Sequence, residues 1–357
     1  MKNNLIQLVK ESIREQENYS IEQGQYRIKL NQNENPYPLP VQLRDQIKEA
    51  WEKADWRRYP EVEAWNLRKI IAQTVNLRPE HIITASGSNE ILRTLFSSLL
   101  GPGRKMVTLA PSFSLYAFYG NLLGAEVKTL RLQHNFRFPV EEIIEQVQDS
   151  RVVLTVLCSP NNPTGNRMPE EAAEKILQSA RGYVLMDEAY VDFCDQDFSG
   201  LSQKFSNLIL LRTFSKAFSF AWGRCGFGIA SPALVEQLYK VLPPYNLNGF
   251  IQTAAGIILQ NRKLVLPVIE KIIQERNRMQ KLLSQNSGLE VYPSQTNFIL
   301  IRPFLKVSKL MKTLQEKSIL IRDVSSYPGL SNEVRITVGR PEENEEVVRV
   351  LGEITGG

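Results

Sequence analysis

The sequence predicts an α/β protein in which a large domain with a mostly parallel sheet is followed by a smaller α+β domain. Short apolar runs rich in β-branched residues alternate with helical periodicity through the middle of the chain, which is typical of βαβ units. The 357 residues are enough for two domains that each bury a core. Pro243 and Pro244 then interrupt the pattern, and mainly helical segments follow them.

Five apolar runs form the expected strands of the large domain, which we assign to residues 41–242. Each run is continuous rather than alternating, as expected for strands that are buried on both faces. Helical segments separate the runs, and this spacing allows parallel pairing. The runs are residues 82–84, 106–109, 152–157, 183–186 and 208–211.

Residues 1–40 are expected to form an N-terminal arm rather than a domain. Apolar residues at helical spacing within residues 5–17 are followed there by a polar, proline-rich stretch. The small domain is assigned to residues 243–357. Its expected elements are amphipathic helices within 250–283, a helix at 307–317, and strands at 298–301 and 334–338.

The composition argues against several other classes of protein. Hydrophobic residues make up 43% and charged residues 23%, which is ordinary for a folded soluble chain. The net charge of +5 is spread along the sequence, so no basic face for nucleic acid is expected. Three separated cysteines and two histidines favour neither a disulfide framework nor a metal site. Without a signal peptide or a membrane-spanning run, the expected location is the cytoplasm.

A carboxylate and an amine each follow a predicted strand. Asp187 comes directly after residues 183–186, at the carboxyl end of a strand, where open α/β sheets bind ligands. A carboxylate there can pair with a cation, and it can equally cap a helix. Lys216 follows the strand at 208–211 and has hydroxyl neighbours; partial desolvation would lower its pKa and make it a nucleophile toward carbonyls. A lysine with an exposed ammonium is the commoner arrangement when this segment is taken alone.

Two further strand ends carry polar residues. Asn162 lies in a turn between Pro160 and Pro163, which can direct an amide toward the end of strand 152–157. Small and hydroxyl residues at 84–90 open a helix, whose free N–H groups favour an anion. Each feature has a purely structural explanation, as a turn and as a helix cap. Together, however, an amine, a carboxylate, an amide and an anion site at one sheet edge match one ligand, pyridoxal 5'-phosphate.

The order of these motifs resembles that of the fold-type I pyridoxal-phosphate aminotransferases. The shared motifs are Asn-Pro-Thr-Gly at 162–165, Asp-Glu-Ala-Tyr at 187–190, and Ser-Lys at 215–216 with an arginine eight residues after the lysine. More narrowly, the chain is similar to the histidinol-phosphate aminotransferase subfamily. The segments that carry this similarity are 33–36, 212–218, 224–227, 244–248, 297–298 and 335–339.

The resemblance implies a role for each matching residue. Lys216 would form a Schiff base with pyridoxal 5'-phosphate and move the substrate proton, and Asp187 would pair with the pyridinium nitrogen. Tyr190 and Asn162 would hydrogen-bond the 3'-oxygen of the ring, and Phe113 would stack on its face. The cofactor phosphate would be held by Gly87, Ser88, Asn89, Thr213, Ser215 and Arg224.

The same resemblance implies the substrates and a homodimer. Arg335 would bind the substrate carboxylate and Arg322 the substrate phosphate, although Arg322 could instead form an exposed ion pair with Asp323 or another carboxylate. Tyr59 would reach the cofactor phosphate of the neighbouring subunit. The implied reaction transfers the amino group of histidinol phosphate to 2-oxoglutarate and yields imidazole-acetol phosphate and glutamate, in histidine biosynthesis.

The sequence differs from the usual subfamily pattern at two places, and three other functions remain open. Phe113 stands where many members have tyrosine, and residues 220–224 read Phe-Ala-Trp-Gly-Arg instead of the usual Leu-Ala-Gly-Leu-Arg. An aromatic amino acid aminotransferase or a threonine-phosphate decarboxylase would share the scaffold; Arg322 argues against the first. A regulatory module of this fold is the third alternative. Such proteins usually add a DNA-binding domain, for which little sequence precedes Asn33.

Overall fold

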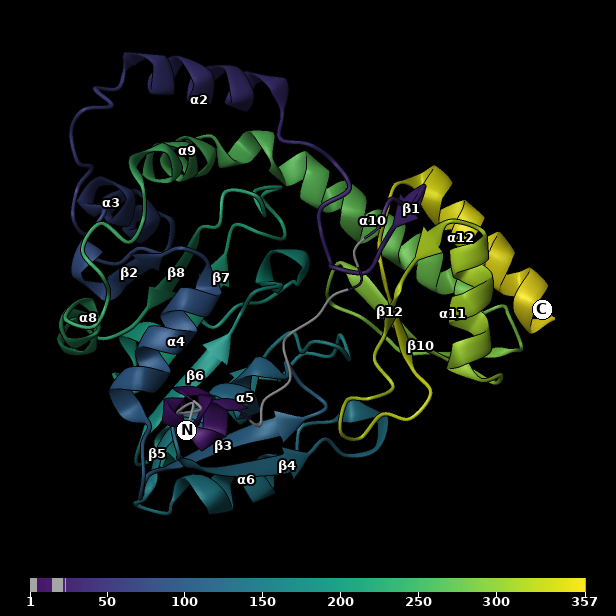
Figure 1. Ribbon diagram of the computed structural model, residues 1–357, viewed down its shortest axis with the longest axis horizontal. Coiled ribbons are helices and arrows are strands. Elements are labelled where there is room, and N and C mark those ends of the chain that lie inside the picture. The colour runs from purple at the N-terminus through teal and green to yellow at the C-terminus, as the bar shows by residue number, and fades with distance from the viewer. Residues whose placement is uncertain (1–4, 15–21, 23, 357) are drawn as a thin grey trace.

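The computed structural model describes residues 5–14, 22 and 24–356. A seven-stranded sheet between helices forms a large unit, and a four-stranded sheet with its own helices forms a small unit beside it (Figure 1). This arrangement confirms the predicted α/β fold. Of the expected arm helix, the 3-10 helix η1 (Leu5–Leu8) and the short α1 (Glu11–Arg14) are described, and residues 15–17 lie outside the described residues.

The large sheet has the strand order β2-β8-β7-β6-β5-β3-β4. Pairing is parallel except at β8, which is antiparallel to both β2 and β7. The carboxyl ends of β2, β5, β6 and β7 therefore lie on one edge of the sheet. The strands are β2 (Ile82–Ala85), β3 (Lys105–Ala110), β4 (Glu126–Arg131), β5 (Val152–Cys158), β6 (Tyr183–Asp187), β7 (Leu208–Thr213) and β8 (Gly226–Ile229).

Helices cover both faces of this sheet, which is why its central strands are mainly apolar. Val156 faces the cluster that contains Leu95, whereas the next residue, Leu157, faces the cluster that contains Ile71 and Ile258. The helices are α2 (Val41–Lys53), α3 (Trp65–Thr74), α4 (Ser88–Leu99), α5 (Leu115–Leu122), α6 (Val140–Val147), α7 (Glu170–Ser179), α8 (Pro232–Tyr239), α9 (Gly249–Gln260) and α10 (Leu266–Leu283). Short 3-10 helices are η2 (Pro79–His81), η3 (His134–Phe136), η4 (Val191–Phe193), η5 (Ser199–Gln203) and η6 (Arg262–Leu264).

The small unit contains an antiparallel sheet of order β12-β13-β10-β9. The arm joins this unit, because β1 pairs in parallel with β11. The elements are β1 (Ile28–Lys29), β9 (Leu289–Val291), β10 (Phe298–Pro303), β11 (Ile319–Leu320), β12 (Arg322–Asp323), β13 (Val334–Thr337), α11 (Val307–Glu316) and α12 (Pro341–Thr355). Within the described part of the chain, no helix is both long and apolar enough to cross a membrane.

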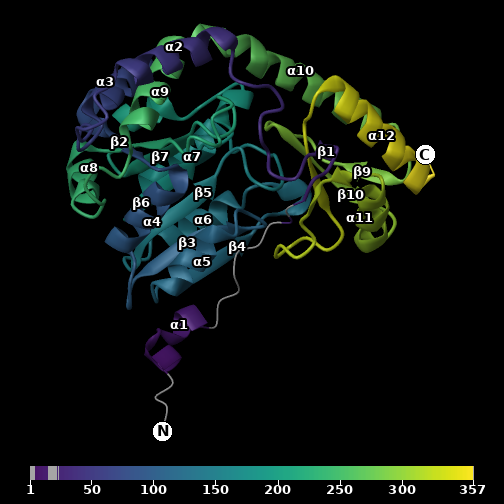
Figure 2. The same ribbon diagram turned by 45° about the horizontal axis from the view of Figure 1, so that its top comes forward.

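The change from one unit to the other lies within α10, later than the expected division at residue 243. Helix α9 packs on α2 and α3, so it belongs to the large unit. Along α10, Ile269 and Ile272 lie in the larger core, whereas Met279 and Leu283 lie in the core of the small unit. Figure 2 shows α10 running from one unit to the other. The proline pair at 243 and 244 lies in the connection between α8 and α9, within the large unit.

Gly226 provides a test of how closely the sheet supports the start of α4. A Cβ at this position would lie 2.3 Å from the backbone nitrogen of Ser88 and 2.7 Å from the carbonyl carbon of Gly87. Both are backbone atoms, so Gly226→Ala must push α4 away from β8. Because overpacking of this kind costs about 1–3 kcal/mol, we expect a lower urea midpoint of unfolding. The control is Gly101→Ala, whose Cβ would meet nothing within 4 Å; equal midpoints for the two variants would contradict the packing argument.

Candidate active site

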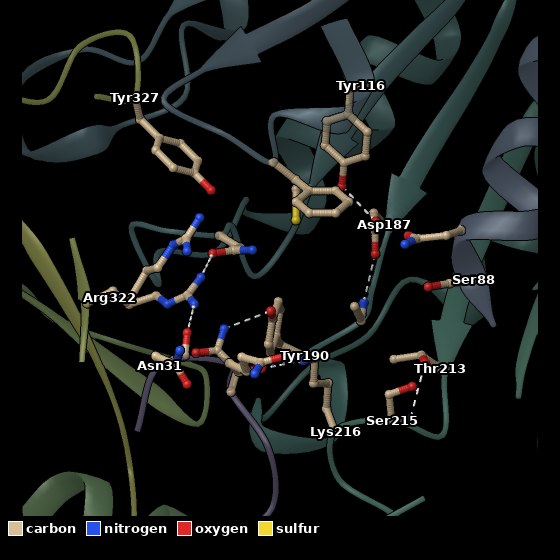
Figure 3. Close-up of a pocket in the computed structure, with 18 of the residues that line it drawn as sticks. Asn31, Ser88, Tyr116, Asp187, Tyr190, Thr213, Ser215, Lys216, Arg322 and Tyr327 are labelled. Carbon is tan, nitrogen blue, oxygen red and sulfur yellow. Dashed lines mark hydrogen bonds between the residues drawn. The ribbon is translucent and has the colours of Figure 1, made fainter. Parts of the chain in front are cut away.

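A cavity of about 310 Å³ lies where the carboxyl ends of β5, β6 and β7 meet the arm and the small unit (Figure 3). It brings together most of the residues that the sequence predicts for the site. Those that line it are Ser88, Asn89, Phe113, Asn162, Asp187, Tyr190, Thr213, Ser215, Lys216, Arg224, Arg322 and Arg335. Seven further lining residues were not predicted: Asn31, Gln32, Asn33, Tyr116, Cys158, Ala189 and Tyr327.

Lys216 follows β7 and lies within the protein rather than on its outer surface. Its Nζ donates a hydrogen bond to the backbone oxygen of Gln32 at 2.8 Å. Burial lowers the pKa of Lys216 to about 7, and the positive charges of Arg335 and Arg224 contribute in the same direction. A large fraction of this amine is therefore neutral near pH 7, as a nucleophile or a proton acceptor requires.

Asp187 ends β6 and has an exposed fraction of only 5%. Its Oδ1 accepts a hydrogen bond from the backbone N–H of Ala189 at 3.0 Å, and its Oδ2 accepts one from the Tyr116 hydroxyl at 2.6 Å. Burial raises the pKa of Asp187 to about 6, while these two hydrogen bonds act to lower it. The carboxyl group is thus mainly ionised at neutral pH, and a cationic group in the cavity would stabilise it.

Tyr116 lines the cavity, although the sequence analysis does not predict it as a site residue. It lies near the start of α5, is fully buried, and meets the ring of Phe113 edge-on with centroids 5.4 Å apart. One residue therefore supports both the buried carboxylate and the aromatic wall of the cavity. A tyrosine three residues after Phe113 has the spacing of an ordinary core residue on a helix, so no local signal marks it as part of the site.

The start of α4 and Arg224 together present donor groups that suit an anion. Gly87 precedes α4 with φ +84°, and a Cβ there would lie 2.5 Å from Nη2 of Arg224. Nη1 of Arg224 donates to Ser215 Oγ at 3.0 Å, and the backbone N–H of Ser215 donates to Thr213 Oγ1 at 3.1 Å. A guanidinium beside the positive end of a 12-residue helix favours a phosphate. Gly87 gives this site its shape without lining the cavity.

Within the unusual segment at 220–224, Arg224 is the residue that lines the cavity. A Cβ at Gly223 would lie 2.3 Å from the ring of Phe220, so the larger aromatic residue at 220 requires glycine at 223. Trp222 is 91% exposed and does not line the cavity. Arg224 keeps its place with φ +50°. Of the three differences in this segment, those at 220 and 223 therefore fit together sterically.

Arg335 and Arg322 lie side by side on two neighbouring strands. They are directly paired in the antiparallel ladder of β12 and β13, so their side chains leave the same face of the sheet. Arg335 donates from Nη1 to Asn162 Oδ1 at 2.5 Å and from Nη2 to the backbone oxygen of Asn31 at 2.8 Å. Among the described residues, no carboxylate lies within ion-pair distance of Arg322, and the Asp323 carboxylate accepts instead from Ser325.

Two like charges in this position favour an anionic ligand, because directly opposed like charges destabilise a sheet. In Figure 3, Arg322 and Tyr327 lie on one side of the cavity, and Asp187, Thr213 and Ser215 lie on the other. The cavity therefore has two separate places for anionic groups. One is the site at the start of α4, and the other is the arginine pair.

Tyr190 also lines the cavity, between the start of α4 and the arginine pair. Its hydroxyl accepts a hydrogen bond from Asn33 Nδ2 at 2.9 Å, and its ring meets Phe298 edge-on at 5.1 Å. Burial raises the pKa of Tyr190, so its hydroxyl stays protonated. Tyr59, in contrast, lies outside the cavity: it is 81% exposed and stacks on Tyr245 with ring centroids 4.6 Å apart.

These residues fit pyridoxal 5'-phosphate. The Lys216 amine matches its aldehyde, the Asp187 carboxylate matches a protonated ring nitrogen, and the site at the start of α4 matches its phosphate. Phe113 supplies an aromatic surface beside Tyr116 for the ring.

Comparisons with known proteins agree with this geometry. Residues 26–351 match the aminotransferase class I and II family. The chain is 37% identical over 337 residues to a histidinol-phosphate aminotransferase of Chlorobaculum tepidum. The aligned region covers 94% of this chain and 97% of that protein. The solved histidinol-phosphate aminotransferase from Clostridium acetobutylicum has a TM-score of 0.86 at 25% identity, over 92% of this chain and 99% of that one. The Sinorhizobium meliloti enzyme of that name, solved in complex with pyridoxal-5'-phosphate, has the same fold, with a TM-score of 0.84 at 22% identity over 93% and 91% of the two chains.

The lowered pKa of Lys216 can be measured through its reaction with an aldehyde. Only the neutral amine adds to a carbonyl, so the rate at which the apoprotein takes up pyridoxal 5'-phosphate should rise with pH through a midpoint near 7. An ordinary lysine would stay protonated to about pH 10. Borohydride reduction and peptide mapping should place the label on Lys216, and Lys216→Ala should lose it. Labelling of an exposed residue such as Lys240 instead would contradict this assignment.

Proposed function

This chain belongs to the class I and II aminotransferases, and on that premise we propose that it transaminates histidinol phosphate with pyridoxal 5'-phosphate as cofactor. The amino group of L-histidinol phosphate passes to 2-oxoglutarate, and the products are imidazole-acetol phosphate and L-glutamate. This reaction is a step of histidine biosynthesis. From that metabolic role we also infer a cytoplasmic location.

The main structural support for histidinol phosphate as the substrate is the pair of arginines, Arg322 and Arg335. Histidinol phosphate has a phosphate and no α-carboxylate, whereas glutamate and 2-oxoglutarate each have two carboxylates. Arg322 and Arg335, side by side on β12 and β13, can bind a phosphate dianion in one half-reaction and a carboxylate in the other. An aromatic amino acid brings only one anionic group and leaves Arg322 without a counter-charge.

The side chains of the cavity divide the work of the reaction. The bound cofactor withdraws electrons from the substrate and so makes its Cα proton acidic. Lys216 Nζ takes that proton and returns it, which its lowered pKa permits near neutral pH. Asp187 keeps the ring nitrogen protonated, and Tyr190 and Asn162 orient the ring through its 3'-oxygen.

The remaining residues hold the two ends of the bound molecules. Thr213, Ser215, Arg224 and the start of α4 bind the cofactor phosphate, while Phe113 packs against the ring. Arg322 and Arg335 bind the far end of the substrate. The cofactor phosphate and the substrate phosphate would therefore be bound by residues on opposite sides of the cavity.

Substrate preference tests the proposal most directly. We expect kcat/KM to be higher for histidinol phosphate than for phenylalanine or threonine phosphate, measured on one preparation with 2-oxoglutarate as acceptor. Arg322→Ala should lower kcat/KM for histidinol phosphate about ten- to several-hundred-fold, because a charge-assisted hydrogen bond is worth about 1.5–3 kcal/mol.

Phenylalanine is the internal control for that variant, since its carboxylate needs chiefly Arg335. Its kcat/KM should fall much less. Equal losses for the two substrates would show that Arg322 supports the fold or the shared carboxylate site. A wild-type preference for phenylalanine, or release of CO₂ from threonine phosphate, would overturn histidinol phosphate as the substrate.

We further propose that the protein is a homodimer whose subunits share their active sites. Tyr59 is exposed although it is an aromatic residue, and it borders an apolar groove of about 860 Å³ lined in part by Trp51, Trp56 and Phe250. An exposed apolar surface of this kind favours association. In this arrangement Tyr59 reaches the cofactor phosphate of the other subunit.

Complementation between two inactive variants tests the shared site. Lys216→Ala lacks the amine, and Tyr59→Ala lacks the residue supplied to the partner. In a mixed dimer, one site combines the intact Lys216 of one chain with the intact Tyr59 of the other. Mixing the two variants should therefore restore up to about a quarter of the wild-type activity, since half of the dimers formed at random are mixed and each has one complete site. No recovery after subunit exchange, or a fully active monomer in analytical ultracentrifugation, would contradict the proposal.

A further inference from the structure

Asn33 joins the arm to both units of the protein at the edge of the cavity. It is 1% exposed, and its φ of +55° lies in the left-handed region that asparagine tolerates better than most residues. Its backbone N–H donates to Thr337 Oγ1 at 2.9 Å, and its backbone oxygen accepts from Asn297 Nδ2 at 3.0 Å. Its side-chain Nδ2 donates to Tyr190 Oη at 2.9 Å.

Thr337 determines which way the Asn33 amide points. The Thr337 hydroxyl donates its proton to Asn33 Oδ1 at 3.1 Å while its oxygen accepts from the Asn33 backbone. If the amide were turned over, Nδ2 would face Thr337, and the buried hydroxyl would lose its acceptor. Because an unsatisfied buried donor is costly, the orientation with Nδ2 toward Tyr190 is favoured.

This orientation of the Asn33 amide determines where the Tyr190 hydroxyl can donate its proton. A tyrosine hydroxyl has one proton to donate and can also accept hydrogen bonds. Since Asn33 donates to it, its own proton is not used in that contact. Among the described residues, none accepts a hydrogen bond from the Tyr190 hydroxyl, and the side chain lines the cavity.

We propose that Asn33 is a positioning residue that directs the hydroxyl proton of Tyr190 into the cavity by donating to Tyr190 Oη. There the proton is available to the 3'-oxygen of the cofactor. The inference rests on the proposed function for the identity of that acceptor. It adds that the polarity of the Asn33 amide, and not only its shape, matters for cofactor binding.

Asn33→Asp tests the polarity with little change in shape. A carboxylate can only accept from Tyr190, so the hydroxyl proton should turn toward residue 33 and away from the cavity. We expect the dissociation constant of pyridoxal 5'-phosphate from the apoprotein to rise about tenfold or more. The pH midpoint of the absorption change of the bound cofactor should also move upward, because its ring oxygen would retain more negative charge. Neither readout depends on turnover.

Tyr190→Phe separates this effect from the added charge. If Asn33 acts through Tyr190, Asn33→Asp should add little to either readout in the Tyr190→Phe background. A direct effect of the new carboxylate would persist there. Asn286→Asp is the control, because Asn286 also exchanges two hydrogen bonds with a threonine: its Nδ2 donates to Thr355 Oγ1 at the end of α12, and that hydroxyl donates to Asn286 Oδ1. It should leave both readouts at the wild-type values.

A second variant covers the case in which Asn33→Asp does not fold. Thr337→Val removes the hydroxyl that orients the amide, and it should change both readouts in the same direction by a smaller amount, only when Tyr190 is present. Wild-type readouts in Asn33→Asp, or in Thr337→Val where that is used, would overturn the inference, as would an undiminished effect in the Tyr190→Phe background. A wild-type protein that binds no pyridoxal 5'-phosphate would instead overturn the proposed function itself.

Discussion

The cavity depends on the hydrogen bonds that hold residues 30–33 of the arm between the two units. Leu30 is bonded on both sides to the small unit: its N–H donates to Leu320 at 2.7 Å, and its oxygen accepts from Thr337 at 3.0 Å. The next three residues each bind one side chain of the site. The pairs are Asn31 with Arg335, Gln32 with Lys216, and Asn33 with Tyr190. Groups from three distant parts of the chain are thus positioned by one short segment.

Burial gives this cavity its chemical character. It lowers the pKa of the Lys216 amine and raises that of the Asp187 carboxyl group, so both move toward neutral pH. The Asp187 carboxylate is still kept mainly ionised by hydrogen bonds from Tyr116 and Ala189. Arginines stand at both ends of the cavity, and each would be stabilised by an anion. A ligand with a phosphate, a ring nitrogen and an aldehyde satisfies the inner groups, and an anionic substrate satisfies the outer ones.

The sequence predicts correctly those strands whose burial produces a simple pattern of apolar residues. The central strands β5, β6 and β7 are buried on both faces and read as continuous apolar runs. β4 escapes prediction because it is an edge strand with mostly exposed residues, and β8 because two of its four residues are glycine. Gly226 in β8 is explained only by the backbone of α4 that packs on it. Its role is therefore invisible until the two elements are placed together.

The sequence by itself determined the fold class, the family, and the residues that lie in contiguous motifs at strand ends, such as Asp187, Tyr190 and Lys216. These residues can be predicted because parallel strands bring their carboxyl ends to one edge, so local position already implies proximity. Only the tertiary structure decided the contacts that complete the site. Tyr116 meets Asp187 across 71 positions, Asn33 meets Tyr190 across 157, and the opposition of Arg322 and Arg335 follows from strand register. Such contacts arise from packing between separate elements, and no periodicity or motif within either element encodes them.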